Sequence, residues 1–279
     1  MKAKNKFLTT TILVLTTVCS TTVYATSISD TSSVPNASIF RGIHDCRKVN
    51  IEEQINMKEL LEKDLSISGE LNSPKILIIH SHPQESYITS KNGGKGNVVE
   101  VGSELEKILE TNYKVSVLHL QGDNNQDLMN AYNRIESRVQ KVLKEYPSIE
   151  VIIDIHRDMA MEPTEVVVND ESIAKINIIN GISMDSDVGT IGSLEGYNNP
   201  YITENLSLST QVKYASEEIA PDLIDSIIIQ KYRYSLHMLP KSLMIDVGNN
   251  MDTIEAAKNA LQPFSEILAE VLKLEKITD

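Results

Sequence analysis

The sequence lacks tryptophan altogether and has only three phenylalanines among its 279 residues. Aliphatic side chains must therefore build the core, and a hydrophobic content of 41% is enough for one large domain or two small ones. The chain also lacks an excess of positive charge, because its formal net charge is -13. Nucleic-acid-binding proteins usually carry a basic face, so this balance argues against a nucleic-acid partner.

Cysteine is nearly absent as well. Cys19 lies within the first 25 residues, and Cys46 is the only other cysteine. If the first 25 residues are removed, no intrachain disulfide can form. The mature chain would then depend on its core, and on a bound metal if it has one.

The amino terminus has the pattern of a targeting signal. Lys2, Lys4 and Lys6 precede an apolar run of 12 residues, 7–18, and "VYA" at 23–25 is typical of a cleavage site. The apolar run is short for a membrane span. We predict that residues 1–25 are a cleaved signal peptide, with a retained N-terminal membrane anchor as the alternative. Either reading predicts an exported protein that is extracytoplasmic, in the cell wall or associated with the membrane.

Three regions follow from the composition. Residues 26–70 begin with a Ser- and Thr-rich stretch and are predicted to be a linker or N-terminal extension. Residues 71–279 alternate apolar runs with helical patterns. We expect strands at 75–80, 113–120, 149–156, 164–168, 174–181 and 241–248, and helices at 98–109, 128–143, 204–218 and 253–272. This alternation predicts a single α/β domain with a mostly parallel central sheet and helices on both faces.

Ionisable residues gather where these strands end. His82 and Glu85 follow the first strand, His156 ends the third, and Asp246 lies in the last. Ligands of such sheets bind at the carboxyl ends of the strands. Two histidines and one carboxylate, with a fourth position for water, describe a catalytic zinc site. In that reading His82, Glu85 and His156 are the ligands, and Asp246 is the general base and acid.

Two residues near these ligands leave alternatives open. His80 precedes His82 by two positions, so along a strand both would point to the same face, and His80 is either the ligand instead or a residue behind the metal. Arg157 either pairs with a neighbouring charge or holds a substrate carboxylate. Histidine and glutamate three residues apart meet by chance in many turns, so that spacing alone is weak support for a metal.

Four segments resemble the stage II sporulation protein P family, exported cell-wall hydrolases of endospore formers. They are "SHPQESY" at 81–87, "DIHRD" at 154–158, "GYNNPYITEN" at 196–205 and "LMIDVGNNMDTIEAA" at 243–257. The resemblance extends over roughly residues 75–260. It implies an amidase fold of the phosphorylase/hydrolase-like type, with zinc held by His82, Glu85 and His156.

The same resemblance implies an activity and its partners. The family cleaves the bond between muramic acid and the stem peptide of peptidoglycan, as N-acetylmuramoyl-L-alanine amidases do, and is also credited with endopeptidase cleavage of cross-links. It acts during engulfment in sporulation, beside a second wall hydrolase, stage II sporulation protein D.

The chain departs from the family pattern at two places. The carboxylate of the last strand is typically glutamate in the family and is Asp246 here. Its side chain is one C–C bond shorter, ~1.5 Å, and misplacement of that size can cost about 10²-fold in rate. The polar segment "YNQDLS" of the family is "YRYSLH" at 232–237. These differences favour an alternative function, a peptidoglycan-binding scaffold with weakened catalysis. A metallocarboxypeptidase-type enzyme is a further alternative.

Overall fold

The computed structural model describes residues 40–41, 52–68, 72–88, 96–121, 130–168 and 170–278. The predicted signal peptide or anchor at 1–25 and Cys46 lie outside these ranges. Within them, no helix combines the length and apolarity needed to cross a membrane.

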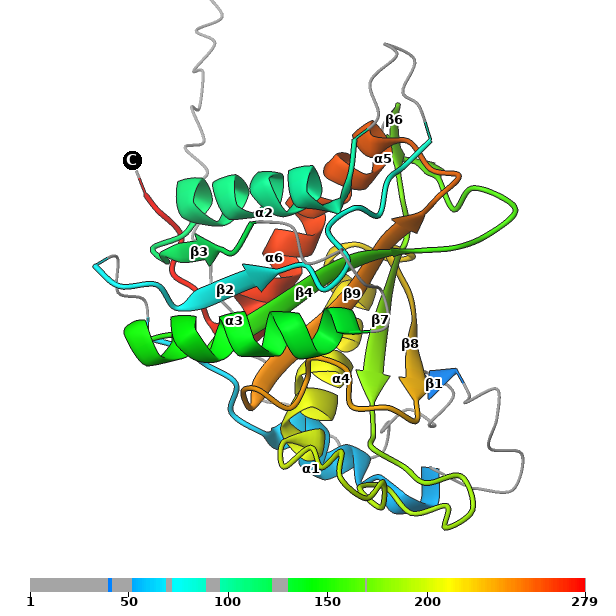
Figure 1. Ribbon diagram of the computed structural model, residues 1–279. Coiled ribbons are helices and arrows are strands. Elements are labelled where there is room, and N and C mark those ends of the chain that lie inside the picture. The colour runs from blue at the N-terminus through cyan, green and yellow to red at the C-terminus, as the bar shows by residue number, and fades with distance from the viewer. Residues whose placement is uncertain are drawn as a thin grey trace, which may run out of the picture. The chain divides into compact units, whose positions relative to one another are not determined.

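A seven-stranded sheet forms the centre of the domain (Figure 1). Its strands lie in the order β1-β8-β7-β9-β4-β2-β3. All neighbouring strands in it are parallel except β7 and β9, which are antiparallel, so the predicted mostly parallel sheet is confirmed. The strands are β1 (Phe40–Arg41), β2 (Ile76–Ile79), β3 (Val117–His119), β4 (Val151–Asp158), β7 (Ile176–Gly181), β8 (Ile224–Gln230) and β9 (Lys241–Asn249).

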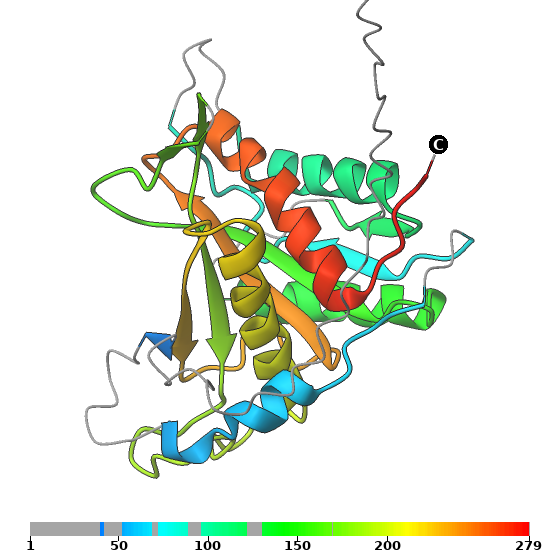
Figure 2. The same ribbon diagram turned by 180° about the vertical axis from the view of Figure 1, so that it is seen from behind.

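Helices cover both faces of this sheet, as the alternating pattern predicts (Figures 1 and 2). One face, here called the α2 face, packs against α2 (Val98–Asn112), α4 (Ile202–Ile219), α5 (Ile254–Asn259) and α6 (Leu261–Leu272). The other, the α3 face, packs against α3 (Ala131–Glu145) and the loop 231–240.

The strand residues alternate between these faces. In β2, Ile76 and Ile78 pack on the α2 face, whereas Leu77 and Ile79 pack on the α3 face. In β4, Ile153 and Ile155 belong to the core of the α2 face and Ile152 to that of the α3 face. Since side chains alternate along a strand, the polar residues Asp154 and His156 point to the α3 face.

The described part of the predicted N-terminal extension packs on the domain. It contains β1, which pairs with β8, a short 3-10 helix (Glu52–Gln54) and α1 (Met57–Glu62). Leu60, Leu65 and Ile67 are buried in the main core. These described residues belong to the same compact unit as the rest of the domain. The outer side of α1 is polar.

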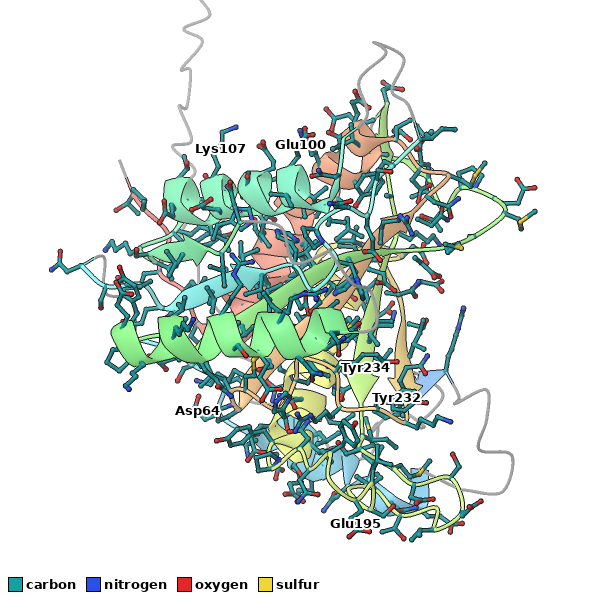
Figure 3. All side chains as sticks on the ribbon, in the orientation of Figure 1. Asp64, Glu100, Lys107, Glu195, Tyr232 and Tyr234 are labelled. Carbon is teal, nitrogen blue, oxygen red and sulfur yellow. The ribbon has the colours of Figure 1, made fainter. Side chains whose placement is uncertain are left out.

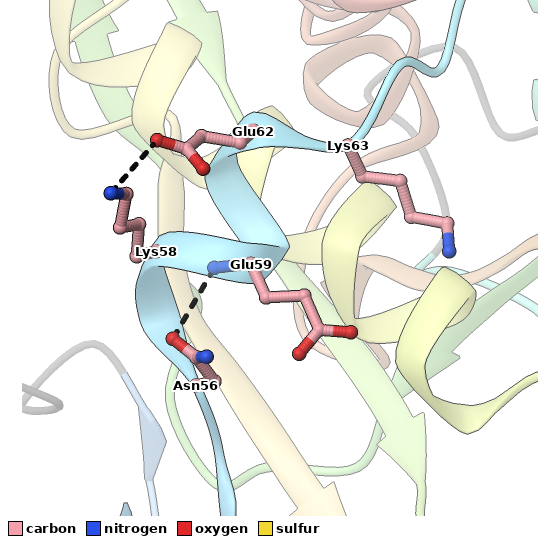
Figure 4. A pocket seen from close by; sticks show the side chains of 5 residues that line it. All are labelled: Asn56, Lys58, Glu59, Glu62 and Lys63. Atoms are coloured by element: carbon pink, nitrogen blue, oxygen red, sulfur yellow. Dashed lines mark hydrogen bonds and ion pairs between the residues drawn. The ribbon is translucent and has the colours of Figure 1, made fainter.

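Local interactions explain where α1 begins. The Asn56 side chain accepts a hydrogen bond of 3.3 Å from the Glu59 backbone N–H, as an N-cap residue does. Lys58 and Glu62 form an ion pair of 3.7 Å one turn apart. Both interactions border a shallow surface pocket lined by the side chains drawn in Figure 4.

Several of the described elements differ from the sequence-based expectation. The strand expected at 164–168 is β5 (Val166–Val168), which pairs with β6 (Glu171–Ile173) in a separate two-stranded ribbon. Strand β8 was not anticipated. The expected helix over 253–272 is two helices, α5 and α6, because Pro263 lacks the N–H that would continue the helical ladder across Ala260.

Candidate active site

A buried carboxylate organises the α3 face at the carboxyl end of β4. Asp154 is fully buried and accepts hydrogen bonds from the Ser81 backbone N–H at 2.9 Å and the Ser81 hydroxyl at 2.5 Å. Ser235, from the loop before β9, donates a third at 2.7 Å. Burial alone would raise the Asp154 pKa, but His156 and these hydrogen bonds hold it well below its usual value. Asp154 therefore ties the end of β2 and the loop 231–240 to β4.

His156 lies between two carboxylates. Its Nδ1 is 3.2 Å from Glu85 Oε2, and its Nε2 is 3.0 Å from Asp154 Oδ1, although this second contact lacks hydrogen-bond geometry. Burial opposes the charged ring, but Asp154 and Glu85 outweigh it and hold the His156 pKa well above its ordinary value. The pair of carboxylates thus attracts a cation to this position.

The turn after β2 is fixed to β4 by Arg157. Its backbone N–H donates to Glu85 Oε2 at 3.2 Å, and its Nε donates to the Ser86 carbonyl at 3.1 Å. A further guanidinium donor, Nη1, reaches the Asp158 carbonyl at 3.2 Å. Burial would raise the pKa of Glu85, but His156 and Arg157 lower it. The Arg157 side chain therefore contacts backbone carbonyls, and contact with a substrate carboxylate stays a prediction.

His82 completes the group. Its ring centroid is 5.4 Å from that of His156 and 5.3 Å from that of Tyr132 on α3. Burial and the neighbouring His156 lower the His82 pKa, which favours the neutral ring that binds metals. The structure thus brings the three predicted ligands, from two segments, to one face.

Asp246 lies across from this group on β9. It is in register with His156 on the neighbouring strand, and it is buried. Burial raises the pKa of Asp246 to about 7, with His156 opposing and Asp158, Glu85 and Asp154 adding to the rise. A carboxyl with a pKa near neutrality can both take and give a proton at physiological pH.

His80 does not share the face of His82, and that expectation is wrong. His80 Nδ1 is 3.0 Å from the Ile155 carbonyl, and its Nε2 is 2.7 Å from His119 Nε2, beneath Gly102 of α2. His80 follows the alternation of Ile76 and Ile78, whereas His82 departs from it, because β2 ends at Ile79 and the chain turns before His82. His119 in turn lies 3.3 Å from Glu106 on α2 through its Nδ1.

Sequence reasoning missed the groups that support the site. Asp154 stood beside His156 in the "DIHRD" segment, and a carboxylate that orients a metal-binding histidine is a common arrangement. Ser81 and Ser235 gave no such signal, because a hydroxyl that holds a buried carboxylate has no distinctive spacing. The contact of Tyr132 with His82 depends on how α3 crosses the sheet, which no local pattern specifies.

The donors present fit a zinc site in kind. Two imidazoles and a carboxylate are the set that catalytic zinc uses; zinc would replace the proton that the neighbouring carboxylates hold on His156, because imidazole binds a metal in its neutral form. As the side chains stand, no group of three or more His, Cys, Asp or Glu within the described ranges is arranged to hold a metal ion. The ligands would have to close in around the ion.

Comparison with known proteins gives one family match. The model of the stage II sporulation protein P family matches residues 24–269. Curated proteins give no match.

Solved structures give distant matches. They include the N-acetylmuramoyl-L-alanine amidase AmiC2 of Nostoc punctiforme, with 12% identity and a TM-score of 0.42 over 71% of this chain and 95% of that one. The CwlD amidase of Clostridioides difficile, solved in complex with the GerS lipoprotein, matches with 10% identity and a TM-score of 0.43 over 71% and 96%. The catalytic domain of CwlV, an amidase from Bacillus (Paenibacillus) polymyxa var. colistinus, matches with 12% identity and a TM-score of 0.40 over 72% and 99%.

Proposed function

Because the chain belongs to the stage II sporulation protein P family, we propose that it is a zinc-dependent hydrolase of peptidoglycan amide bonds. The bond cleaved is that between muramic acid and L-alanine, with cross-link cleavage as a second activity. The observation that carries this proposal is the position of His156. It lies between Glu85 and Asp154, with the His82 ring beside it and Asp246 in register on the next strand.

His82, Glu85 and His156 would hold the zinc ion. Zinc bound there supplies a Lewis acid for the amide carbonyl and lowers the pKa of water. Asp154 faces the other nitrogen of His156 and so orients the ring, and Ser81 and Ser235 hold Asp154 in turn. Arg157 keeps Glu85 in place through its backbone N–H.

Asp246 moves the proton in this mechanism. It takes a proton from the attacking water and passes it to the amide nitrogen as the C–N bond breaks, which leaves a free carboxylate and a free amine. Its burial suits both steps, because burial makes the carboxyl a stronger base than an exposed aspartate. The shorter aspartate carboxylate is one of the two places, with the segment 232–237, in which this chain departs from the family pattern.

The location and partners of the enzyme follow from the family. We infer that the protein is exported by its N-terminal segment, which either is cleaved or anchors it to the membrane. It would act on the wall during engulfment in sporulation, beside a stage II sporulation protein D-type hydrolase.

The test is hydrolysis of dye-labelled cell walls with and without a chelator. We expect dye release that the chelator abolishes and added zinc restores. Mass spectrometry of the products should show free amino groups on L-alanine and intact glycan. Products shortened by single terminal amino acids would instead identify a carboxypeptidase.

Metal content provides an independent measurement. The wild type should bind about one zinc per chain, and His82→Ala and His156→Ala should each bind much less. A wild-type protein without zinc after purification and zinc addition would refute the metal site.

A second candidate function is a wall-binding scaffold with little catalysis, which Asp246 and the altered segment "YRYSLH" favour. It predicts a protein that binds walls and zinc but does not cleave, and in which Asp246→Glu raises hydrolysis. The proposed enzyme predicts hydrolysis by the unaltered chain.

A further inference from the structure

A row of aromatic rings runs from the surface to the candidate active site. Tyr232 is 52% exposed, and its ring lies 6.3 Å from that of Tyr234. The Tyr234 ring lies 5.4 Å from Tyr132, which is 5.3 Å from His82. Figure 3 shows Tyr232 and Tyr234 next to each other near the ends of β7 and β8. We call Tyr232, Tyr234 and Tyr132 the tyrosine row.

The loop that carries two of these tyrosines is fastened from both sides. Ser235 donates to Asp154 at 2.7 Å, which joins the loop to the candidate site. Glu136, one helical turn after Tyr132, lies 3.1 Å from Arg233 Nη2 and 3.2 Å from His237 Nε2. The row is therefore held in place before any ligand binds, which lowers the entropy cost of binding.

The backbone of this loop is strained at the row. Tyr234 has φ 49°, in the left-handed region that bulky residues rarely adopt. Gly181, at the end of β7, allows the loop to pack, because a Cβ there would lie 2.1 Å from the Tyr232 carbonyl oxygen. Strain of this kind persists where the surroundings impose it and gathers at ligand sites.

The cationic side chains beside the tyrosine row already have partners. Arg233 is paired with Glu136, and its guanidinium lies 5.6 Å from the Tyr197 ring. Lys231 lies over the Tyr232 ring at 5.2 Å, a cation–π contact that orients the ring. Recognition of peptide carboxylates would use free cations, whereas the row offers aromatic rings with hydroxyl groups, of which Tyr232 is the exposed one.

We propose that the tyrosine row binds the glycan strand of peptidoglycan and leads it to the candidate active site. Sugar rings have an apolar face bordered by hydroxyl groups, which matches the face and the phenol group of tyrosine. The row connects to His82, so a bound strand would place its peptide-bearing sugars near the reacting groups. This inference rests on the proposed function, since it names how the same site holds its polymer.

The test is co-sedimentation of the full chain with glycan strands from which all peptides have been removed. Tyr232→Ala should weaken binding about five- to tenfold, the loss expected for one stacked ring. Tyr232→Phe should bind within about twofold of the wild type, because it keeps the ring face. Ile219→Ala is the control, since Ile219 is 37% exposed but lies at the end of α4 on the other face of the sheet. It should bind as the wild type does.

The outcomes separate this inference from the proposed function, because binding of peptide-free strands requires no hydrolysis. Binding that depends on the Tyr232 ring supports the row, even if the wild type cleaves no wall. Equal binding by the wild type and Tyr232→Ala overturns the row, even if both cleave walls. Competition by free stem peptides but not by glycan would also overturn it, in favour of peptide recognition.

Discussion

Two histidine pairs at the same strand ends lie on opposite faces of the sheet and have opposite environments. His82 and His156 lie on the α3 face beside Glu85 and Asp154. His80 and His119 lie on the α2 face, where their Nε2 atoms are 2.7 Å apart. Burial lowers the pKa of His80 and of His119 to about 4, whereas carboxylates raise that of His156.

The difference shows that neighbouring carboxylates, and not residue type or strand, set the direction in which the pKa of a buried histidine moves. The pair on the α2 face is uncharged at neutral pH, and its two rings contact each other between the sheet and α2. The pair on the α3 face is next to carboxylates that draw a cation to it. We expect the α3-face pair to control hydrolysis and the α2-face pair to control stability.

The strongest way to test this contrast is His156→Ala. It removes the proposed ligand between two carboxylates, so hydrolysis of labelled walls should fall by about 10²-fold or more. Circular dichroism should show that the variant folds. Activity near the wild-type level in a folded His156→Ala protein would assign hydrolysis to other groups.

A second large effect is expected at Asp246. Asp246→Asn cannot accept the proton of water, so the rate should fall by about 10²-fold with little change in zinc content. Asp246→Glu is the matched control and should keep or raise activity, since it retains the carboxylate. If Asp246→Asn loses zinc in proportion to activity, Asp246 is a ligand and not a base.

On the α2 face, His119→Ala should cost stability instead of activity. It removes the contact of the buried His80 Nε2 with His119, which should lower the free energy of unfolding in urea by about 1–3 kcal/mol, while zinc content stays unchanged. The folded fraction should cleave walls at the wild-type rate. A His119→Ala protein of full stability and reduced cleavage would reverse the assignment of the two faces.

The same pair predicts a dependence on pH. The folded pKa of His119 is about 4 and its ordinary value is 6.5, so the unfolded chain binds more protons between these values. The contribution of His119 to stability is therefore fully present above about pH 6.5 and falls as the pH drops toward 4. Between pH 7 and pH 5, the free energy of unfolding in urea should fall less for His119→Gln than for the wild type. An equal loss in both would place the dependence elsewhere.

The smallest expected effect is at Gly102, where two terms oppose each other. Glycine within a helix is usually less stable than alanine by about 1 kcal/mol. Here a Cβ would lie 2.7 Å from His80 Nε2 and 2.8 Å from His119 Nε2, so overpacking should outweigh the gain. We expect Gly102→Ala to lower the free energy of unfolding by about 1 kcal/mol. A Gly102→Ala protein more stable than the wild type would show that the side chains of His80 and His119 can move to accommodate the added Cβ.

Much of this arrangement follows from the sequence. The apolar runs predict the parallel strands β2, β4 and β9, and their polar ends predict that His82, Glu85, His156 and Asp246 gather at one edge. The alternation within β4 also fixes the face of His156, because the strand continues through Asp158. These inferences depend on the local spacing of apolar and polar residues, and the strands of the folded chain follow that spacing.

Other parts could not be predicted because they depend on long-range packing. Alternation from Ile76 and Ile78 places His80 on the α2 face, but β2 ends at Ile79, so the face of His82 is decided by the turn that follows. The direction of β7 relative to β9 depends on the path of the chain between them, not on the composition of either strand. The serines around Asp154 and the crossing of α3 over the sheet likewise arise from tertiary contacts.

The order in which the chain is synthesised decides when the hydrogen-bond network around Asp154 is complete. Ser81 and His156 are made early, whereas Ser235 and Asp246 come from the carboxyl-terminal part of the chain. A nascent chain that ends before Ser235 therefore has its histidines and Glu85 but lacks a hydroxyl of the buried frame and the proposed base. The proposed site is therefore complete only after residues 235–246 have been made.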